Sequence, residues 1–154
     1  AGPLPFGTGF HPYFQVPRTA RRERAACFVD VPAARRMTPV GRYDQFTGKP
    51  FPAQNWSVAA DVADTLFLSD LQKRELALVD PGSELEVVLN WEDAPQFRHA
   101  ALWSKTTDTP FYCLEPWTSL PNAFTRHARD HDLILIEPQQ SFRSAMWMEV
   151  RTMV

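Results

Sequence analysis

Fourteen prolines are spread along the 154 residues of this chain, and they restrict its fold more than any other feature. Their share is about twice the usual value of roughly 5%. Proline lacks the backbone N–H that a helix interior needs, so long helices are disfavoured, whereas short strands joined by turns are compatible with it. The sequence therefore predicts an all-β protein. Its length is enough for one domain, residues 1–154, with a core of its own.

The clearest predicted hairpin spans residues 74–91. Residues 80–83 read Asp-Pro-Gly-Ser, in which proline pre-sets the second turn position and glycine tolerates a positive φ. In the strand that follows, apolar residues alternate with polar ones: Leu85, Val87, Leu89 and Trp91 against Glu84, Glu86 and Asn90. This period of two predicts a half-buried antiparallel strand with the four apolar side chains on one face.

Other segments are assigned from their composition. Residues 1–9 are expected to form an approach loop or an edge strand. Further strands are predicted at residues 10–16, 25–31, 99–103 and 111–115, and residues 133–136 and 145–154 are expected to close the sheet. Residues 33–55, with five prolines and glycines as punctuation, are predicted to be irregular. Residues 119–132 form the single expected loop or helical excursion.

Composition narrows the classes of partner. The formal net charge of −2 gives no electrostatic reason to expect nucleic acid or an anionic membrane as a partner. The sequence contains no run of eighteen apolar residues that would predict a membrane span. Two cysteines, Cys27 and Cys113, are too few for a disulfide scaffold and suit a reducing cytoplasm. No Cys/His spacing matches a structural zinc site, and His127 and His131 are expected in a solvated loop, so no metal is predicted.

Two residues suited to proton transfer each stand directly before a proline: His11 before Pro12 and Glu115 before Pro116. The residue before proline is pushed into an extended conformation, so both are expected on strands or strand ends. A histidine and a carboxylate on a stiff sheet can act as an acid/base pair. The alternatives are a packed, hydrogen-bonded histidine and an exposed edge glutamate. The face that Glu115 shares with Phe111, Cys113 and Trp117 favours a function, because a carboxylate on an apolar face needs a partner.

These two runs also carry a resemblance to a known family. Residues 6–14, Phe-Gly-Thr-Gly-Phe-His-Pro-Tyr-Phe, resemble the His-x-Tyr-Phe motif of the aldose 1-epimerase (galactose mutarotase-like) family. Residues 113–123, Cys-Leu-Glu-Pro-Trp-Thr-Ser-Leu-Pro-Asn-Ala, resemble its second motif, a strand glutamate followed by a Pro-Asp/Asn-Ala turn. The two motifs occur in the family's order. The resemblance implies an antiparallel β-sandwich, the galactose mutarotase-like supersandwich, of which this chain matches only the C-terminal half or so.

The resemblance also implies an activity and a site. A mutarotase interconverts the α and β anomers of a hexose through the open aldehyde, with a small-molecule sugar as its substrate and no cofactor. Glu115 would be the base and His11 the acid. Tyr13, Trp117 and Asp64 would contact the sugar. Phe10 would add to the aromatic pocket wall.

Several alternatives stay open at this point. A hexose-6-phosphate mutarotase would need convergent arginines or lysines, and Arg18, Arg21, Arg22 and Arg126 supply them by sequence. A non-catalytic carbohydrate-binding domain could use the same fold. The chain is expected to be a fragment of a longer protein. In that case the missing N-terminal half or another copy of the chain is its expected partner. The other possibility is that the chain is a shortened relative with an incomplete pocket.

Overall fold

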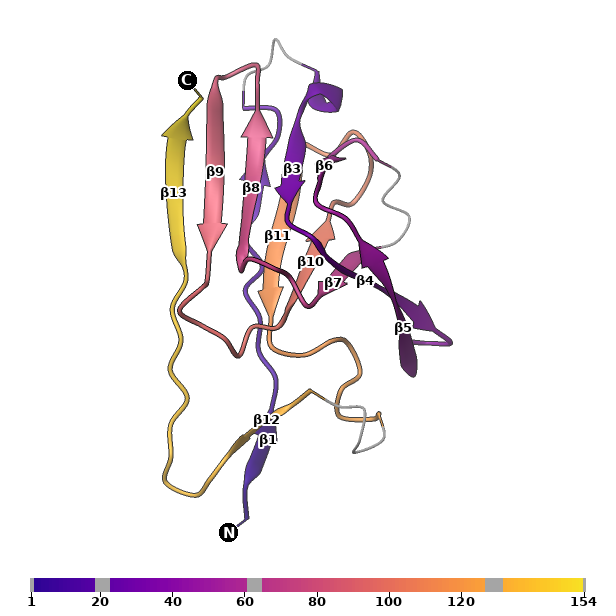
Figure 1. The fold of residues 1–154 in the computed structure, drawn as a ribbon, viewed down its shortest axis with the longest axis vertical. Coiled ribbons are helices and arrows are strands. Elements are labelled where there is room, and N and C mark those ends of the chain that lie inside the picture. Colours follow the sequence, from indigo (N-terminus) through magenta and orange to yellow (C-terminus); the bar gives the residue numbers. More distant parts are fainter. Residues whose placement is uncertain (1, 19–22, 61–64, 127–131, 154) are drawn as a thin grey trace.

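The computed structural model describes residues 2–18, 23–60, 65–126 and 132–153, and it is built from antiparallel strands (Figure 1). The strands are β1 (Leu4–Phe6), β2 (Tyr13–Gln15), β3 (Phe28–Val31), β4 (Ala34–Val40), β5 (Gln45–Phe51), β6 (Gln54–Ser57), β7 (Leu66–Ser69), β8 (Glu75–Asp80), β9 (Leu85–Asn90), β10 (His99–Trp103), β11 (Phe111–Trp117), β12 (Ile134–Ile136) and β13 (Trp147–Thr152). Among the described residues, the one helical element is a 3₁₀ turn, Arg24–Ala26. The predicted all-β, antiparallel fold class is confirmed.

Two sheets make up most of the molecule. One has six strands in the order β2-β11-β10-β7-β4-β5, and the other has five in the order β13-β9-β8-β3-β6. Their facing sides share one apolar core, to which the five-stranded sheet contributes Val29, Val31, Leu76, Leu78 and Leu89, and the six-stranded sheet contributes Leu66, Leu68, Ala100, Leu102, Tyr112 and Leu114. This is the sandwich architecture in which each strand turns alternate side chains toward the other sheet.

The six-stranded sheet has a second face, turned away from this core, which we call the outer face. Side chains alternate along a strand, and directly paired residues of neighbouring strands share a face. Because Tyr112 and Leu114 point inward, Cys113, Glu115 and Trp117 of β11 belong to the outer face. Their partners in register are Trp103, Ala101 and His99 of β10 and Tyr13 of β2. The face that carries the predicted carboxylate is therefore set by the period of two, as expected.

Residues 33–55 are not irregular, so that prediction is wrong. They form β4 and β5, two paired seven-residue strands joined by a turn with Gly41 and Tyr43 at positive φ. The prolines are tolerated because of their positions: Pro50 lies on an edge strand, and Pro39 lies beyond the part of β4 that pairs with β7. On the unpaired side of a strand the N–H groups make no ladder hydrogen bond, so a proline whose nitrogen faces that side breaks none.

The predicted strand at residues 25–31 is shorter than expected, because the 3₁₀ turn Arg24–Ala26 precedes β3. The predicted strand at residues 10–16 likewise narrows to β2. His11 therefore lies just before a strand rather than within one. The hairpin at residues 74–91 is confirmed as β8 and β9, although Val88 is also buried, in a small cluster with Ala77 and Val79 on the far face of that sheet.

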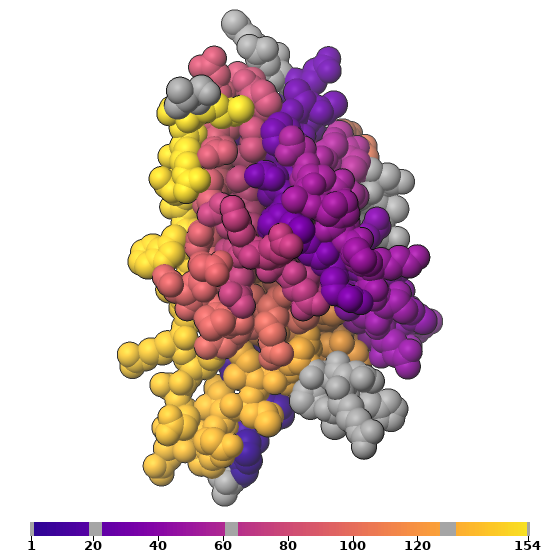
Figure 2. Space-filling view, in the orientation of Figure 1, coloured from indigo at the N-terminus to yellow at the C-terminus, as the bar shows by residue number. Residues whose placement is uncertain are grey.

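The two C-terminal strands separate. β13 pairs with β9 and closes the five-stranded sheet, whereas β12 pairs with β1 in a ribbon of its own at the lower end of Figure 1. The expectation that residues 133–136 close the main sheet is therefore wrong. Figure 2 shows β13, in yellow, along one flank of the molecule, where Trp147, Met148 and Val150 are exposed. No helix among the described residues is long and apolar enough to cross a membrane.

Candidate active site

Glu115 is a buried carboxylate in the middle of a sheet. It lies in β11 opposite Ala101 of β10, and only 2% of its surface is exposed. Burial penalises the charged form of the acid and raises the pKa of Glu115 to about 7, although a hydrogen bond from the Trp117 side chain acts in the opposite direction. A carboxylate with such a pKa exchanges protons readily near neutral pH.

His11 reaches this carboxylate because the chain before β2 runs along the end of β11. The backbone N–H of Phe10 donates to the carbonyl of Pro116 at 3.0 Å, and that of Thr118 donates to the carbonyl of Thr8 at 2.9 Å. The Thr118 hydroxyl adds two more bonds, accepting from the N–H of Thr8 and donating to its carbonyl. The segment 7–11 is thus fixed to β11 chiefly through main-chain groups.

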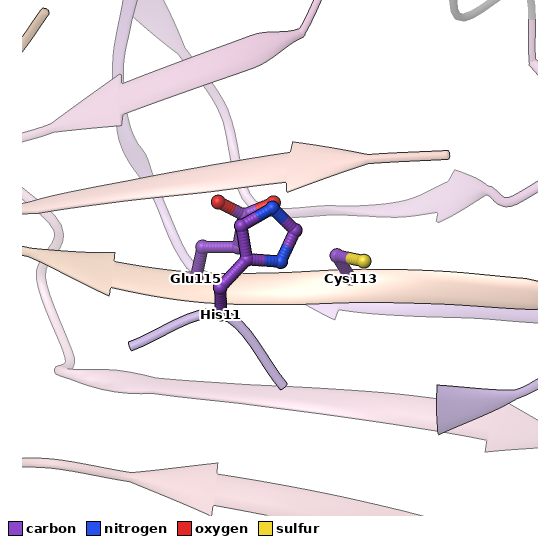
Figure 3. Close-up of side chains that lie close together, drawn as sticks. All are labelled: His11, Cys113 and Glu115. Atoms are coloured by element: carbon purple, nitrogen blue, oxygen red, sulfur yellow. The ribbon is translucent and has the colours of Figure 1, made fainter. Parts of the chain in front are cut away.

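The two groups form a close pair. His11 Nε2 lies 3.4 Å from Glu115 Oε1 (Figure 3). The imidazole is half exposed, 47% of its side chain being accessible, whereas the carboxylate beneath it is not. The Tyr13 ring stacks on the imidazole at 4.8 Å between centroids, and Trp103 meets it edge-on at 5.9 Å. Two aromatic rings therefore hold the imidazole over the carboxylate.

Glycine is required at one position of this arrangement. Gly9 forms an isolated β-bridge with Trp117, and a Cβ atom added at Gly9 would overlap the Trp117 indole. The absence of a side chain therefore allows the indole to lie against the segment that carries His11. The same indole makes the hydrogen bond to Glu115, so this contact affects the carboxylate directly.

A cleft of about 560 Å³ opens beside the pair, lined by residues 7–11, Trp117 and residues 119–125. A volume of this size suits a small molecule. The turn at its edge contains Asn122 at φ 58, a left-handed conformation that asparagine tolerates. The Asn122 amide donates to the carbonyl of Arg42 in the β4–β5 turn at 2.7 Å, which ties the rim of the cleft to the six-stranded sheet.

A second polar cluster on the outer face was not predicted from the sequence. The Ser69 hydroxyl lies 2.6 Å from His99 Nδ1, His99 Nε2 contacts the Asp132 carboxylate, and Asp132 also accepts from Arg126 at 2.8 Å. Burial alone would raise the pKa of Asp132. The hydrogen bond and charge of His99 outweigh burial, with smaller contributions from the Leu120 N–H and from Arg126, so the pKa of Asp132 is lowered.

This cluster closes a hollow of about 430 Å³ that shares Leu120 with the cleft. Its hydrogen bonds pin the loop after β11 to β10, because Asp132 accepts from the backbone N–H of Leu120 at 3.0 Å. His99 lies on the same face as Trp117 because the two residues pair in register, which the sequence alone does not reveal. The arrangement is a structural clasp for the loop that forms one wall of the cleft.

The predicted site residues have different outcomes. His11 and Glu115 come together, and Tyr13 and Trp117 contact one or the other. Phe10 lines the cleft and stacks on Phe97. Asp64 lies outside the described residues, as do His127 and His131.

Cys113 had no predicted role, although its place on the face of Glu115 was expected. Its thiol lies within 4.8 Å of the ligand atoms of His11 and Glu115. Both Cys27 and Cys113 are buried free thiols.

Comparison with known proteins supports the fold. No protein-family model and no curated protein matches the sequence. A galactose mutarotase-like protein from Clostridium acetobutylicum has 18% identity and a TM-score of 0.73, the match covering 99% of this chain and 49% of that one. A galactose mutarotase related enzyme from Lactobacillus acidophilus has 19% identity and a TM-score of 0.74, with 98% and 53% covered.

A third solved structure is a proposed aldose 1-epimerase from Escherichia coli K12. It has 18% identity and a TM-score of 0.68, the match covering 99% of this chain and 53% of that one. At these identities the likeness establishes the fold, which is the galactose mutarotase-like fold. The chain spans about half the length of these structures.

Proposed function

We propose that this chain carries the acid/base pair of an aldose 1-epimerase-like mutarotase, an isomerase of carbohydrate metabolism that interconverts the α and β anomers of a hexose. The observation that carries the proposal is the contact between the buried Glu115 carboxylate and the half-exposed His11 imidazole, 3.4 Å apart, beside a cleft. The fold it shares with galactose mutarotase-like proteins supports the same function.

The chemistry requires one base and one acid. Ionised Glu115 removes the proton of the anomeric hydroxyl while the imidazolium of His11 donates a proton to the ring oxygen. The C1–O5 bond breaks, and C1 becomes an aldehyde. The aldehyde rotates about the C1–C2 bond, and the two residues exchange roles for ring closure. Neutral His11 takes the O5 hydroxyl proton as O5 attacks C1. Protonated Glu115 returns a proton to the aldehyde oxygen. Each positioned acid or base contributes about 10²–10⁴-fold.

The surroundings of the pair suit a sugar. Aromatic faces such as those of Tyr13 and Trp117 can pack against the C–H surfaces of a pyranose and exclude water. Both rings lie beside the pair, because Tyr13 stacks on His11 and Trp117 bonds to Glu115. We propose these two residues and Asp64 as sugar contacts.

A phosphorylated hexose is less well supported. Of the four arginines that could bind its phosphate, Arg18 and Arg126 lie in the described ranges. The Arg18 guanidinium donates to the carbonyl of Leu85 at 3.3 Å, and that of Arg126 is paired with Asp132. Both are engaged with protein oxygens, so the unphosphorylated aldose is the better supported substrate class.

The test is anomer exchange followed by NMR on glucose, galactose and glucose 6-phosphate. Wild-type protein is compared with Glu115→Gln and His11→Asn, and Glu92→Gln serves as the control because Glu92 is an exposed carboxylate outside the cleft. We expect exchange that each site variant reduces by at least about 10²-fold and that the control retains. Retained exchange in Glu115→Gln would overturn the assignment of the base.

The measurement is made on this chain and on any longer product of its gene, because the solved structures it resembles are about twice its length. We propose that a further segment of the protein, or a second copy of the chain, supplies the rest of the sugar pocket. Exchange confined to the longer product would support this. Sugar binding without exchange in both would leave the alternative of a non-catalytic carbohydrate-binding domain.

A further inference from the structure

A buried thiol stands next to the acid/base pair, and the proposed reaction does not use it. Cys113 lies two residues before Glu115 on β11, on the same face, and is completely buried. Its Sγ atom, the ring nitrogen of His11 and the carboxylate oxygen of Glu115 all lie within 4.8 Å of one another. Figure 3 shows the three side chains gathered over one stretch of β11. Within the part of the chain that the structure describes, no other His, Cys, Asp and Glu side chains form such a group.

We propose that His11, Cys113 and Glu115 bind a thiophilic divalent cation, of which Zn²⁺ is the type, and that the bound ion blocks the acid/base pair. One imidazole, one thiolate and one carboxylate are ligand types that zinc accepts. Three protein ligands with the fourth position open is a common arrangement for a site that small molecules reach.

The distances fit a tetrahedral ion after small movements. With Zn–N and Zn–O near 2.1 Å and Zn–S near 2.3 Å, ligand atoms lie roughly 3.4–3.7 Å apart. The 3.4 Å between His11 Nε2 and Glu115 Oε1 already meets this spacing. Because the thiol lies within 4.8 Å of the other two ligand atoms, it needs a shift of at most about 1 Å. The half-exposed imidazole gives the ion access from solvent.

A cation bound here takes the place of protons on the buried acids Cys113 and Glu115. Burial and, to a smaller extent, the neighbouring Glu115 carboxylate together raise the pKa of Cys113 to about 12. A dication compensates both buried acids, and its binding displaces the thiol proton to solvent. Hard ions such as Mg²⁺ prefer oxygen ligands and gain little from a thiolate.

The test uses Co²⁺ as a spectroscopic probe on protein from which any polyhistidine tag has been removed. We expect visible d–d bands with a near-ultraviolet thiolate-to-cobalt charge-transfer band, and Zn²⁺ should displace both. Cys113→Ser should abolish the charge-transfer band. Cys27→Ser should keep it, which makes it the matched control: Cys27 is also buried and also lies beside a carboxylate, that of Asp80.

His11→Asn provides a second arm should Cys113→Ser fail to fold, because His11 is half exposed and lies outside the strands. This variant should weaken Co²⁺ binding at least about tenfold. The proposal is overturned by absence of the charge-transfer band in the wild type, by its persistence in folded Cys113→Ser, or by its loss in folded Cys27→Ser alone.

The blocking of anomer exchange by Zn²⁺, and its reversal by a chelator, rests on the proposed function, whereas the cobalt spectrum does not. A charge-transfer band in a protein that shows no exchange, either as this chain or as a longer product of its gene, would refute the mutarotase and keep the metal site. Exchange that Zn²⁺ leaves unchanged at concentrations that displace Co²⁺ would refute the blocking.

Discussion

Replacing Glu115 with glutamine should stabilise the fold at alkaline pH. The pKa of Glu115 rises from an ordinary value of 4.5 to about 7 because the carboxyl is buried. Between these two values the folded state binds more protons than the unfolded state, so this group lowers the free energy of unfolding as pH rises. At roughly 1.4 kcal/mol for each pKa unit, the loss reaches about 3 kcal/mol above pH 7. Glutamine has nearly the same shape and never ionises, so it avoids this loss.

The assay is urea unfolding of wild type and Glu115→Gln at pH 5 and pH 8, in buffer that contains a chelator. The variant should be more stable by about 3 kcal/mol at pH 8 and by less than about 1 kcal/mol at pH 5. An equal difference at both pH values would refute the reasoning, because it would mean that the carboxyl does not titrate between them in the folded state. A variant that is less stable at pH 8 would show that the ionised carboxylate is fully compensated by His11.

Three further predictions concern the surroundings of the pair. Gly9→Ala should displace the Trp117 indole and reduce anomer exchange at least tenfold while the far-ultraviolet circular dichroism spectrum stays unchanged; unaltered exchange would contradict the role of this contact. Asp132→Asn should lower the free energy of unfolding by about 2 kcal/mol at pH 7. The difference between variant and wild type should shrink as pH falls below the ordinary pKa of 3.8, because the stabilisation by a lowered carboxyl pKa is lost in acid. Calorimetry across pH would test it. The rate of exchange in chelator should rise with pH around an apparent pKa near 7, and an acid limb centred near 4.5 would indicate an unburied base.

The position of Glu115 within its sheet could be predicted from the sequence, because strand periodicity is local. Residues 111–117 alternate between the core and the outer face, and this alternation alone puts Glu115 beside Cys113 and Trp117. Its contact with His11 could not be predicted from periodicity. That contact depends on main-chain bonds between the segment 7–11 and the end of β11, and only the resemblance in residues 6–14 and 113–123 suggested it.

The missed elements have a common cause. Proline and glycine predict irregular backbone in residues 33–55, but their effect on a strand depends on whether the N–H side faces a neighbour. That depends on which strand is at the edge of the sheet, as β5 is. The apolar residues 133–136 similarly indicate a strand without naming its partner, and β1 rather than a main-sheet strand pairs with them. The His99–Asp132 contact joins two segments whose pairing no local pattern reveals.

The attachment of the segment 7–11 to β11 has a consequence for how the site can diversify. Thr8 contributes its N–H and carbonyl to this attachment, while the side-chain partner comes from Thr118. Thr8 also lines the cleft. Substitutions at position 8 can therefore change what the cleft accepts without altering the 3.4 Å between His11 and Glu115. Under the proposed function, substrate choice and proton transfer would be separable, so a library at residue 8 is the natural starting point for directed evolution.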